Sequence, residues 1–240
     1  MPRPRSSYVK KPQQLIPPFQ RALLRWYARY QRPLPWRRTR DPYKILVSEI
    51  MLQQTQVDRV VPKYHEFLHR YPTVTALAQA RVPELKKVWY PLGYNIRPIR
   101  LRNIAKHVVA RHHGRIPNSY DGLLAMEGVG RYTAGAVLSF AFKQDAPIVD
   151  TNVERLLRRY FGLAAGNGKE TARRQLWDLA SRVIPQGKAY QINQAMMDFG
   201  ALVCTARAPT CPSCVLRRHC RSYPYGQATA SARPSSRRRH

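Results

Sequence analysis

Acidic residues and long apolar runs are both scarce in this 240-residue sequence. Only 13 Asp and Glu stand against 42 Lys and Arg, so the formal net charge is +29. A charge of this size far exceeds what solubility requires and indicates a polyanionic partner. No apolar run approaches the roughly 18 to 20 residues that span a bilayer, so nucleic acid is favoured over a membrane.

The N-terminus has basic residues but no apolar segment after them, which argues against a secretory signal. The protein is therefore expected in the cytoplasm, associated with the nucleoid, as in a prokaryote. It is expected to be a monomer. Residues 1–13 and 224–240 are rich in Arg, Lys, Ser and Pro and lack apolar periodicity. They are interpreted as two disordered basic arms that attract phosphates without sequence preference.

Convincing strand patterns are also lacking, and the periodic segments between the arms are helical in pattern. One helix is expected over 17–30, and a single long helix over 42–69. Further helices are expected over 73–80, 82–88, 97–112, 119–126, 132–142, 150–160, 170–183 and 189–203. The predicted fold class is therefore all-α.

Glu49 lies in the predicted helix 42–69, on or beside its apolar face, and Gln53 follows one turn later. Most helical glutamates are solvated, so periodicity alone favours a Glu49 that pairs with one of the many arginines. The alternative is a carboxylic acid in a partly apolar pocket, with a raised pKa, that donates a proton near neutral pH.

A Gly-x-Gly turn, Gly128-Val129-Gly130, separates two predicted helices, and Tyr132 falls on the first turn of the second. Such a turn can be an ordinary helix connection, but next to a helix N-terminus it can bind a DNA phosphate without reading sequence. The +29 charge favours phosphate binding. Asp150 lies just before another predicted helix, and taken alone it is best explained as the N-cap of that helix.

Cysteine occurs nowhere outside residues 204–220, where Cys204, Cys211, Cys214 and Cys220 follow a predicted helix. In a reducing compartment such a cluster indicates a metal site before it indicates disulfides. Four thiolates suit tetrahedral zinc or an iron–sulfur cluster, and the spacing alone leaves both open. Basic residues at 217–219 indicate that this loop can also touch DNA.

Four motifs, at 34–37 (Leu-Pro-Trp-Arg), 48–57, 128–135 and 193–198, resemble those of helix–hairpin–helix DNA glycosylases of the endonuclease III and MutY superfamily. The resemblance covers about residues 17–222 and is closest to MutY adenine glycosylases. It implies a two-lobed all-α fold with DNA and a flipped base between the lobes. Residues 42–142 would form a six-helix barrel with the hairpin, and 14–41 with 143–223 would form an iron–sulfur lobe.

The resemblance also implies a role for each matching residue. Glu49 matches the catalytic acid that protonates a purine, and Asp150 matches the carboxylate that stabilises an oxocarbenium-like sugar. Tyr132 stands where bifunctional relatives place a lysine, so Schiff-base lyase chemistry is excluded there. The four cysteines match the ligands of a [4Fe–4S] cluster. The residues expected to contact mismatched double-stranded DNA are Gln53, Gln54, Gln56, Tyr94, Asn95, Gly128, Gly130, Arg131, Thr133 and Asn152.

Two departures from MutY leave the excised base open. The usual Gly-Tyr-Tyr appears as Gly93-Tyr94-Asn95, and only about twenty residues follow Cys220, where typical MutY proteins carry a domain that recognises 8-oxoguanine. Removal of adenine opposite guanine or 8-oxoguanine is favoured. The alternative is removal of thymine or uracil opposite guanine, since that branch also has tyrosine at the position of Tyr132. A non-catalytic damage-binding protein is disfavoured by the presence of both Glu49 and Asp150. An electron-transfer protein is disfavoured because the chain around the cysteines is devoted to DNA contacts.

Overall fold

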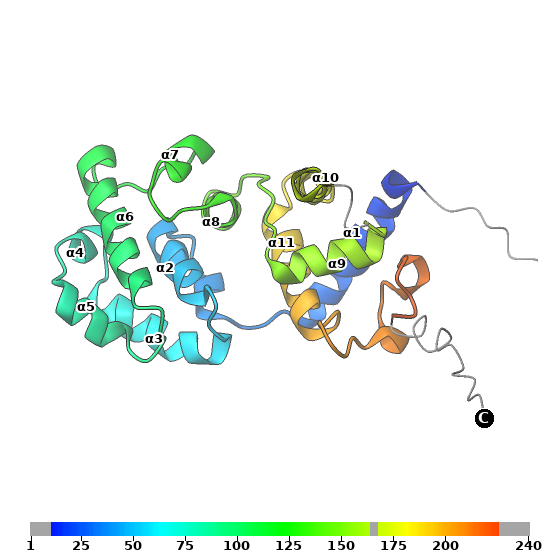
Figure 1. Cartoon of the computed structure of the whole chain (residues 1–240), viewed down its shortest axis with the longest axis horizontal. Helices are drawn as coiled ribbons and strands as arrows, with labels where there is room; N and C mark the ends of the chain where they lie inside the picture. Colours follow the sequence, from blue (N-terminus) through cyan, green and yellow to red (C-terminus); the bar gives the residue numbers. More distant parts are fainter. Residues whose placement is uncertain (1–10, 164–167, 226–240) are drawn as a thin grey trace, which may run out of the picture. The chain divides into compact units, whose positions relative to one another are not determined.

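The computed structural model describes residues 11–163 and 168–225. Within these residues every regular element is a helix and no strand occurs, which confirms the all-α class (Figure 1). The elements are α1 (Pro12–Tyr30), η1 (Pro35–Arg38), α2 (Pro42–Leu52), α3 (Val57–Arg70), α4 (Val74–Ala78), α5 (Val82–Trp89), α6 (Ile96–His112), α7 (Tyr120–Leu124), α8 (Arg131–Phe140), α9 (Thr151–Phe161), α10 (Lys169–Arg182), α11 (Ala189–Leu202), η2 (Cys211–Ser213) and η3 (Arg217–His219).

The chain forms two compact units. Within the described residues, unit 1 contains 11–31, the described part of 149–185, and 191–225. Unit 2 contains 32–148 and 186–190. The predicted basic arms, 1–13 and 224–240, lie largely outside the described residues, although α1 already begins at Pro12.

The core of unit 1 joins the N-terminal helix α1 to helices from the second half of the chain (Figure 1). The Phe19 ring lies 4.9 Å from the ring of Tyr160 and 5.4 Å from that of Phe161. Trp26 meets Phe199 of α11 edge-on at 4.9 Å. Because tilted and edge-to-face rings stabilise a core beyond their area burial, α1 is held firmly against α9 and α11.

The core of unit 2 is built around α2, which contacts α3, α6, α8 and η1. Its residues 45–51 are all buried, so this helix has almost no solvated face. Asp41 caps its N-terminus and accepts hydrogen bonds from the backbone N–H groups of Tyr43 (2.9 Å) and Lys44 (3.4 Å). An N-cap of this kind satisfies donors that a helix leaves unpaired, so the start of α2 is well defined.

The prediction of one continuous helix over 42–69 is wrong. Helix α2 ends at Leu52, α3 begins at Val57, and a turn separates them. Gln54 adopts a left-handed φ of 57°, which no α-helix contains. The uncharged polar stretch from Gln53 to Gln56 is therefore displayed on a turn rather than on a helix face.

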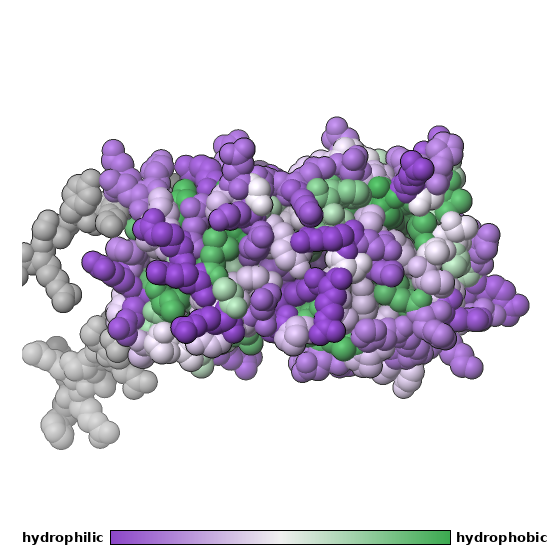
Figure 2. Space-filling model, turned by 180° about the vertical axis from the view of Figure 1, so that it is seen from behind, coloured by the Kyte–Doolittle hydropathy of each residue, from purple (hydrophilic) through white to green (hydrophobic). Residues whose placement is uncertain are grey.

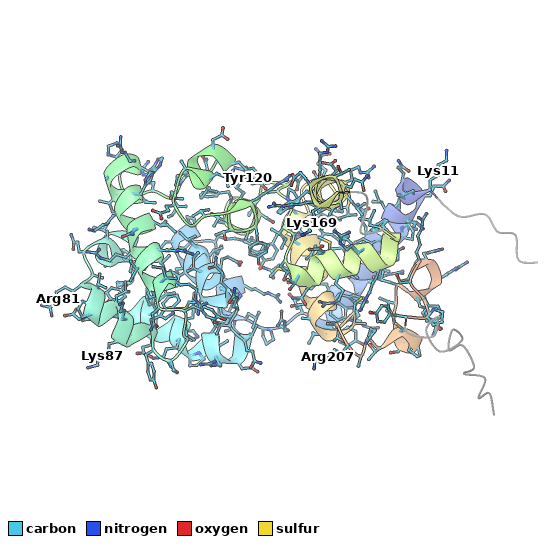
Figure 3. All side chains as sticks on the ribbon, viewed as in Figure 1. Lys11, Arg81, Lys87, Tyr120, Lys169 and Arg207 are labelled. Carbon is cyan, nitrogen blue, oxygen red and sulfur yellow. The ribbon has the colours of Figure 1, made fainter. Side chains whose placement is uncertain are left out.

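Basic side chains are distributed over the surfaces of both units. Figure 2 shows a face that is largely hydrophilic, with small apolar areas between the polar ones. Lys11, Arg81, Lys87, Lys169 and Arg207, labelled in Figure 3, are all exposed. None of the helices in the described part of the chain is both long and apolar enough to cross a membrane.

Candidate active site and cysteine site

Glu49 is buried in the middle of α2, with only 3% of its surface exposed. Leu46 and Ile50 beside it on the helix are 1% and 2% exposed, so the carboxyl group does not lie on a solvated helix face. Burial disfavours the charged form of a carboxyl group. The position therefore suits an acid that keeps its proton until a substrate takes it.

Two polar turns of unit 2, Gln53–Gln56 and Gly93–Asn95, lie side by side because both bond to the buried Arg97. Its guanidinium donates to the carbonyl oxygen of Gln53 in one turn and to that of Gly93 (3.0 Å) in the other. The predicted DNA-contacting residues Gln54, Gln56, Tyr94 and Asn95 on these turns are exposed, and Gln53 is half-buried. Residues 40 positions apart in sequence thus form one surface.

Arg97 is the functional candidate that the sequence analysis missed. In a chain with 42 Lys and Arg, an arginine near the start of a predicted helix is expected to be solvated. It is 4% exposed. The available signal was its position two residues after the Gly93-Tyr94-Asn95 segment that was compared with the family.

The glycine turn lies between α7 and α8. Gly128 has a φ of 88°, a conformation that side chains with Cβ rarely adopt, and Val129 is buried with its N–H bonded to the Met126 carbonyl (3.0 Å). The first helical hydrogen bond of α8 runs from Ala134 N–H to Gly130 C=O. The N–H groups of the first turn, before Ala134, therefore point along the helix axis out of its N-terminus. A phosphate placed there can accept hydrogen bonds from them.

Three further predicted residues lie on the first turn of α8. Arg131 is exposed, Tyr132 is half-buried, and Thr133 is 3% exposed. Because the Thr133 side chain is buried, any contact of this residue with a phosphate has to use its backbone N–H.

Asp150 belongs to unit 1 and caps α9. Its Oδ1 accepts a hydrogen bond from the N–H of Val153 (2.7 Å), and its Oδ2 accepts one from the Asn152 side chain (3.1 Å). The N-cap role considered for Asp150 is therefore present. Its carboxylate lies at the positive end of the α9 dipole and is held in one orientation by two donors.

Hydrogen bonds connect this carboxylate to the cysteine-bearing loop. Arg155 donates to the side-chain oxygen of Asn152 (2.8 Å) and to the backbone carbonyls of Gly200 (2.6 Å) and Cys204 (2.8 Å). A Cβ on Gly200 would lie 2.8 Å from the Cβ and the carbonyl oxygen of Asn152. The glycine thus permits a close approach of α11 to the start of α9.

The four cysteine side chains line one pocket of unit 1, together with apolar residues of its core such as Leu156, Phe199 and Leu216. Arg159 donates to the Cys204 sulfur (3.6 Å) and to the Thr205 carbonyl (2.7 Å). Cys204, Cys214 and Cys220 also pack against the apolar core of unit 1, and Arg159 places a positive charge next to the Cys204 sulfur.

Burial, with a smaller contribution from the charges of the neighbouring thiols, raises the pKa of the Cys220 thiol to about 11. Burial raises the pKa of Cys214 as well. Within the described residues, no three His, Cys, Asp or Glu side chains converge tightly enough to hold a single metal ion. Four cysteine thiols lining one pocket are the donor type that both tetrahedral zinc and an iron–sulfur cube use.

The predicted site residues divide between the units. Glu49, Tyr132, the two polar turns and the glycine turn belong to unit 2, whereas Asp150, Asn152 and the cysteines belong to unit 1. Each unit thus carries one of the two predicted catalytic carboxyl groups on or beside a well-packed helix.

Comparison with known proteins assigns this chain to a family. A family model described as the HhH-GPD superfamily base excision DNA repair protein matches residues 47–182. The chain belongs to this superfamily.

Relatives of two kinds are similar to the chain. An adenine DNA glycosylase from Rattus norvegicus is 40% identical over 228 residues, covering 91% of this chain and 44% of that protein. A thymine/uracil-DNA glycosylase from Pyrobaculum aerophilum is 37% identical over 202 residues, covering 82% of this chain and 88% of that protein. The chain thus spans about half the length of the adenine glycosylases it resembles.

Among solved structures, a thermostable thymine-DNA glycosylase matches with a TM-score of 0.81 and 33% identity, covering 88% of this chain and 97% of that one.

The close approach at Gly200 yields a test of the geometry around Asp150. Gly200→Ala should lower the free energy of unfolding by about 1 to 3 kcal/mol, because the new methyl group forces α11 away from Asn152. Gly130→Ala is the control, since nothing lies within 4 Å of a Cβ there and its φ is −91°. Urea denaturation measures both. Equal stability of the two variants would contradict the close approach.

Proposed function

We propose that this protein is a DNA glycosylase that hydrolyses the N-glycosidic bond of a mispaired base in double-stranded DNA, with adenine opposite guanine or 8-oxoguanine as the first candidate. The observation that carries the proposal is the buried carboxyl group of Glu49, 3% exposed, on the central helix of a chain of the base excision repair superfamily. The similarity to adenine DNA glycosylases supports the choice of adenine.

Glu49 is the proposed general acid. Its burial favours the protonated form, and transfer of that proton to a purine ring nitrogen makes the base a better leaving group. The electron pair of the glycosidic bond then leaves with the base, a water oxygen bonds to C1′, and the proton that this water loses restores the acid form of Glu49. Because α2 is buried on nearly all sides, the acid is held in place without any cost of ordering it during the reaction.

Asp150 is the proposed electrostatic partner. An ionised carboxylate stabilises the positive charge that develops on the sugar as the bond breaks. The hydrogen bonds from Val153 and Asn152 fix the orientation of its two oxygens before the substrate arrives.

Tyr132 makes the proposed enzyme monofunctional. A phenol cannot form the Schiff base that an amine forms with C1′, so the strand is left intact at an abasic site. This inference concerns the first turn of α8, where Tyr132 lies.

DNA binding is proposed to use the glycine turn for a phosphate and the two polar turns for the bases next to the vacated position. The net charge of +29 supplies the attraction to the duplex. We propose in addition that unit 2 is the six-helix barrel lobe with the helix–hairpin–helix and that unit 1 is the iron–sulfur lobe. Asn152 is proposed to contact DNA from α9. The protein is proposed to act as a monomer.

The cysteine pocket is proposed to hold a [4Fe–4S] cluster on Cys204, Cys211, Cys214 and Cys220. Bound there, the cluster supplies a cross-link that organises the chain from Cys204 to Cys220. No proposed catalytic residue lies in this loop, so the cluster has a structural role rather than one in bond breaking. Arg159, which already donates to the Cys204 sulfur, would neutralise part of the charge of the thiolates.

Removal of thymine or uracil opposite guanine is the second candidate, favoured by the coverage of two similar proteins and by Asn95. The Pyrobaculum aerophilum relative is matched over 88% of its length, and the thymine-DNA glycosylase structure over 97% of its chain. Asn95, which stands where a second tyrosine is usual in adenine glycosylases, is exposed on the turn next to Tyr94.

Substitution of the two carboxyl groups tests the proposed chemistry. Glu49→Gln should slow adenine release by about 10² to 10⁴ because no proton is delivered. Asp150→Asn should slow it by about 10² to 10³ while DNA affinity is retained. Single-turnover rate constants and gel-shift titrations measure these effects.

The matched controls are Glu66→Gln in unit 2 and Asp178→Asn in unit 1, both exposed acids outside the proposed site. An Asp150→Asn enzyme with an unchanged rate would remove Asp150 from the mechanism. Loss of adenine release with retention of thymine release in Glu49→Gln would restrict the proton transfer to purines.

Metal analysis tests the cysteine pocket. Anaerobically purified protein should contain iron and inorganic sulfide with visible absorbance, and Cys214→Ser should lose both because one thiolate ligand is removed. Ser213→Ala, the adjacent exposed residue, is the control and should retain the cluster. Stoichiometric zinc without iron in the wild-type protein would contradict the cluster assignment.

A further inference from the structure

We propose that Arg97 is a positioning residue that locks the Gln53–Gln56 turn and the Gly93–Asn95 turn into one rigid surface and thereby sets selectivity for the base opposite the excised one. The inference rests on the proposed function for its consequence, but the lock itself is a property of the free protein.

The guanidinium of Arg97 is surrounded by oxygen atoms from both turns and from the end of α2. Its Nη1 donates to the carbonyls of Ile50 (3.3 Å), Met51 (2.9 Å) and Gln53. Its Nη2 donates to the Thr55 hydroxyl and to the carbonyls of Leu92 and Gly93, each at 3.0 Å.

The charge of this side chain is retained although it is 4% exposed. Burial lowers the pKa of Arg97, yet an arginine stays protonated at neutral pH. A buried cation is costly unless its donors are satisfied, and here five carbonyl oxygens and the Thr55 hydroxyl accept from Nη1 and Nη2, whereas Nε has no partner among the described residues. Removing any of these acceptors by moving one turn away therefore carries a large penalty.

The position at the end of α2 explains why the carbonyls are available. The last carbonyls of a helix have no N–H partner within it and form the negative end of its dipole. Ile50 and Met51 lie in the last turn of α2, the helix that carries Glu49. Arg97 thus caps α2 and ties its end to both turns.

Both turns contain unfavourable backbone conformations that need such support. Gln54 and Tyr94 are non-glycine residues with φ of 57° and 49°. Left-handed conformations of this kind persist only where the surroundings impose them. The Tyr94 ring also lies 5.3 Å from the Arg97 guanidinium, within cation–π range, so the arginine contacts a predicted DNA-binding residue directly.

Lysine cannot replace this arginine. Six acceptors lie around two nitrogen atoms of a planar fork, whereas an ammonium group offers three donors from one point. A lysine keeps the charge but can reach only part of this set. The substitution therefore separates the effect of the fork from that of the charge.

Hydrogen–deuterium exchange of the free protein tests the lock. Arg97→Lys and Arg97→Gln should increase amide exchange in 53–56 and in 93–95 by about tenfold or more, with α9 and α10 unchanged. Arg102→Gln is the matched control, because Arg102 is a half-buried arginine of the same helix whose Nε donates to the Ala80 carbonyl (2.6 Å) outside both turns. Faster exchange in only one turn, or no change in Arg97→Lys, would overturn the lock.

Single-turnover kinetics test its consequence. The duplexes carry adenine opposite guanine, 8-oxoguanine or cytosine. Arg97→Lys should reduce the ratio of the rate constant for the preferred opposite base to that for a rejected one by about tenfold or more. The rate constant for the preferred duplex itself should change less. Equal slowing on every duplex would overturn the selectivity role. A wild-type protein that releases no base would refute the proposed function while the exchange result still decides the lock.

Discussion

Burial of α2 on nearly all its sides is the constraint on which the proposed site depends. A helix with no solvated face has to satisfy its polar groups internally, and α2 does so at both ends, through Asp41 at its N-terminus and Arg97 at its C-terminus. Ser48, which is fully buried, donates to the Ile45 carbonyl (2.7 Å). Glu49 is thus carried on a support that cannot shift without exposing apolar core residues, and the proposed proton transfer to one ring nitrogen depends on this rigidity.

Unit 1 fixes the orientation of its carboxylate, Asp150, in a different way. Its carboxylate lies at a helix start rather than inside a helix, and its orientation comes from the N-cap bond and from Asn152. Arg155 extends this network to the backbone of Cys204, so the start of α9 and the beginning of the cysteine loop are one hydrogen-bonded structure. A cluster that organises this loop would therefore stabilise the segment that presents Asp150. The proposed catalytic carboxylate and the proposed cluster site of unit 1 thus share one hydrogen-bonded backbone.

Local signals in the sequence predict most of the helices and fail where tertiary contacts decide. Apolar periodicity predicts the all-α class, and Asp150 before a helical pattern predicts an N-cap, because both depend on neighbouring residues alone. Periodicity also runs through 42–69 without a break, since Gln53 to Gln56 contain neither proline nor glycine. At the break, the carbonyls at the end of α2 accept hydrogen bonds from Arg97, more than 40 residues away in the sequence. The burial of Glu49 likewise follows from the helices around α2 rather than from its own pattern.

Base release by the wild-type protein tests the central claim most directly. Duplexes containing A·8-oxoG, A·G, T·G, U·G and hypoxanthine pairs are incubated with the protein, and free bases and strand lengths are analysed before and after alkali. The account predicts release of one free base, adenine in the first instance, from a strand that stays intact until alkali cleaves it. Absence of any released base, or strand scission without alkali, would contradict the account.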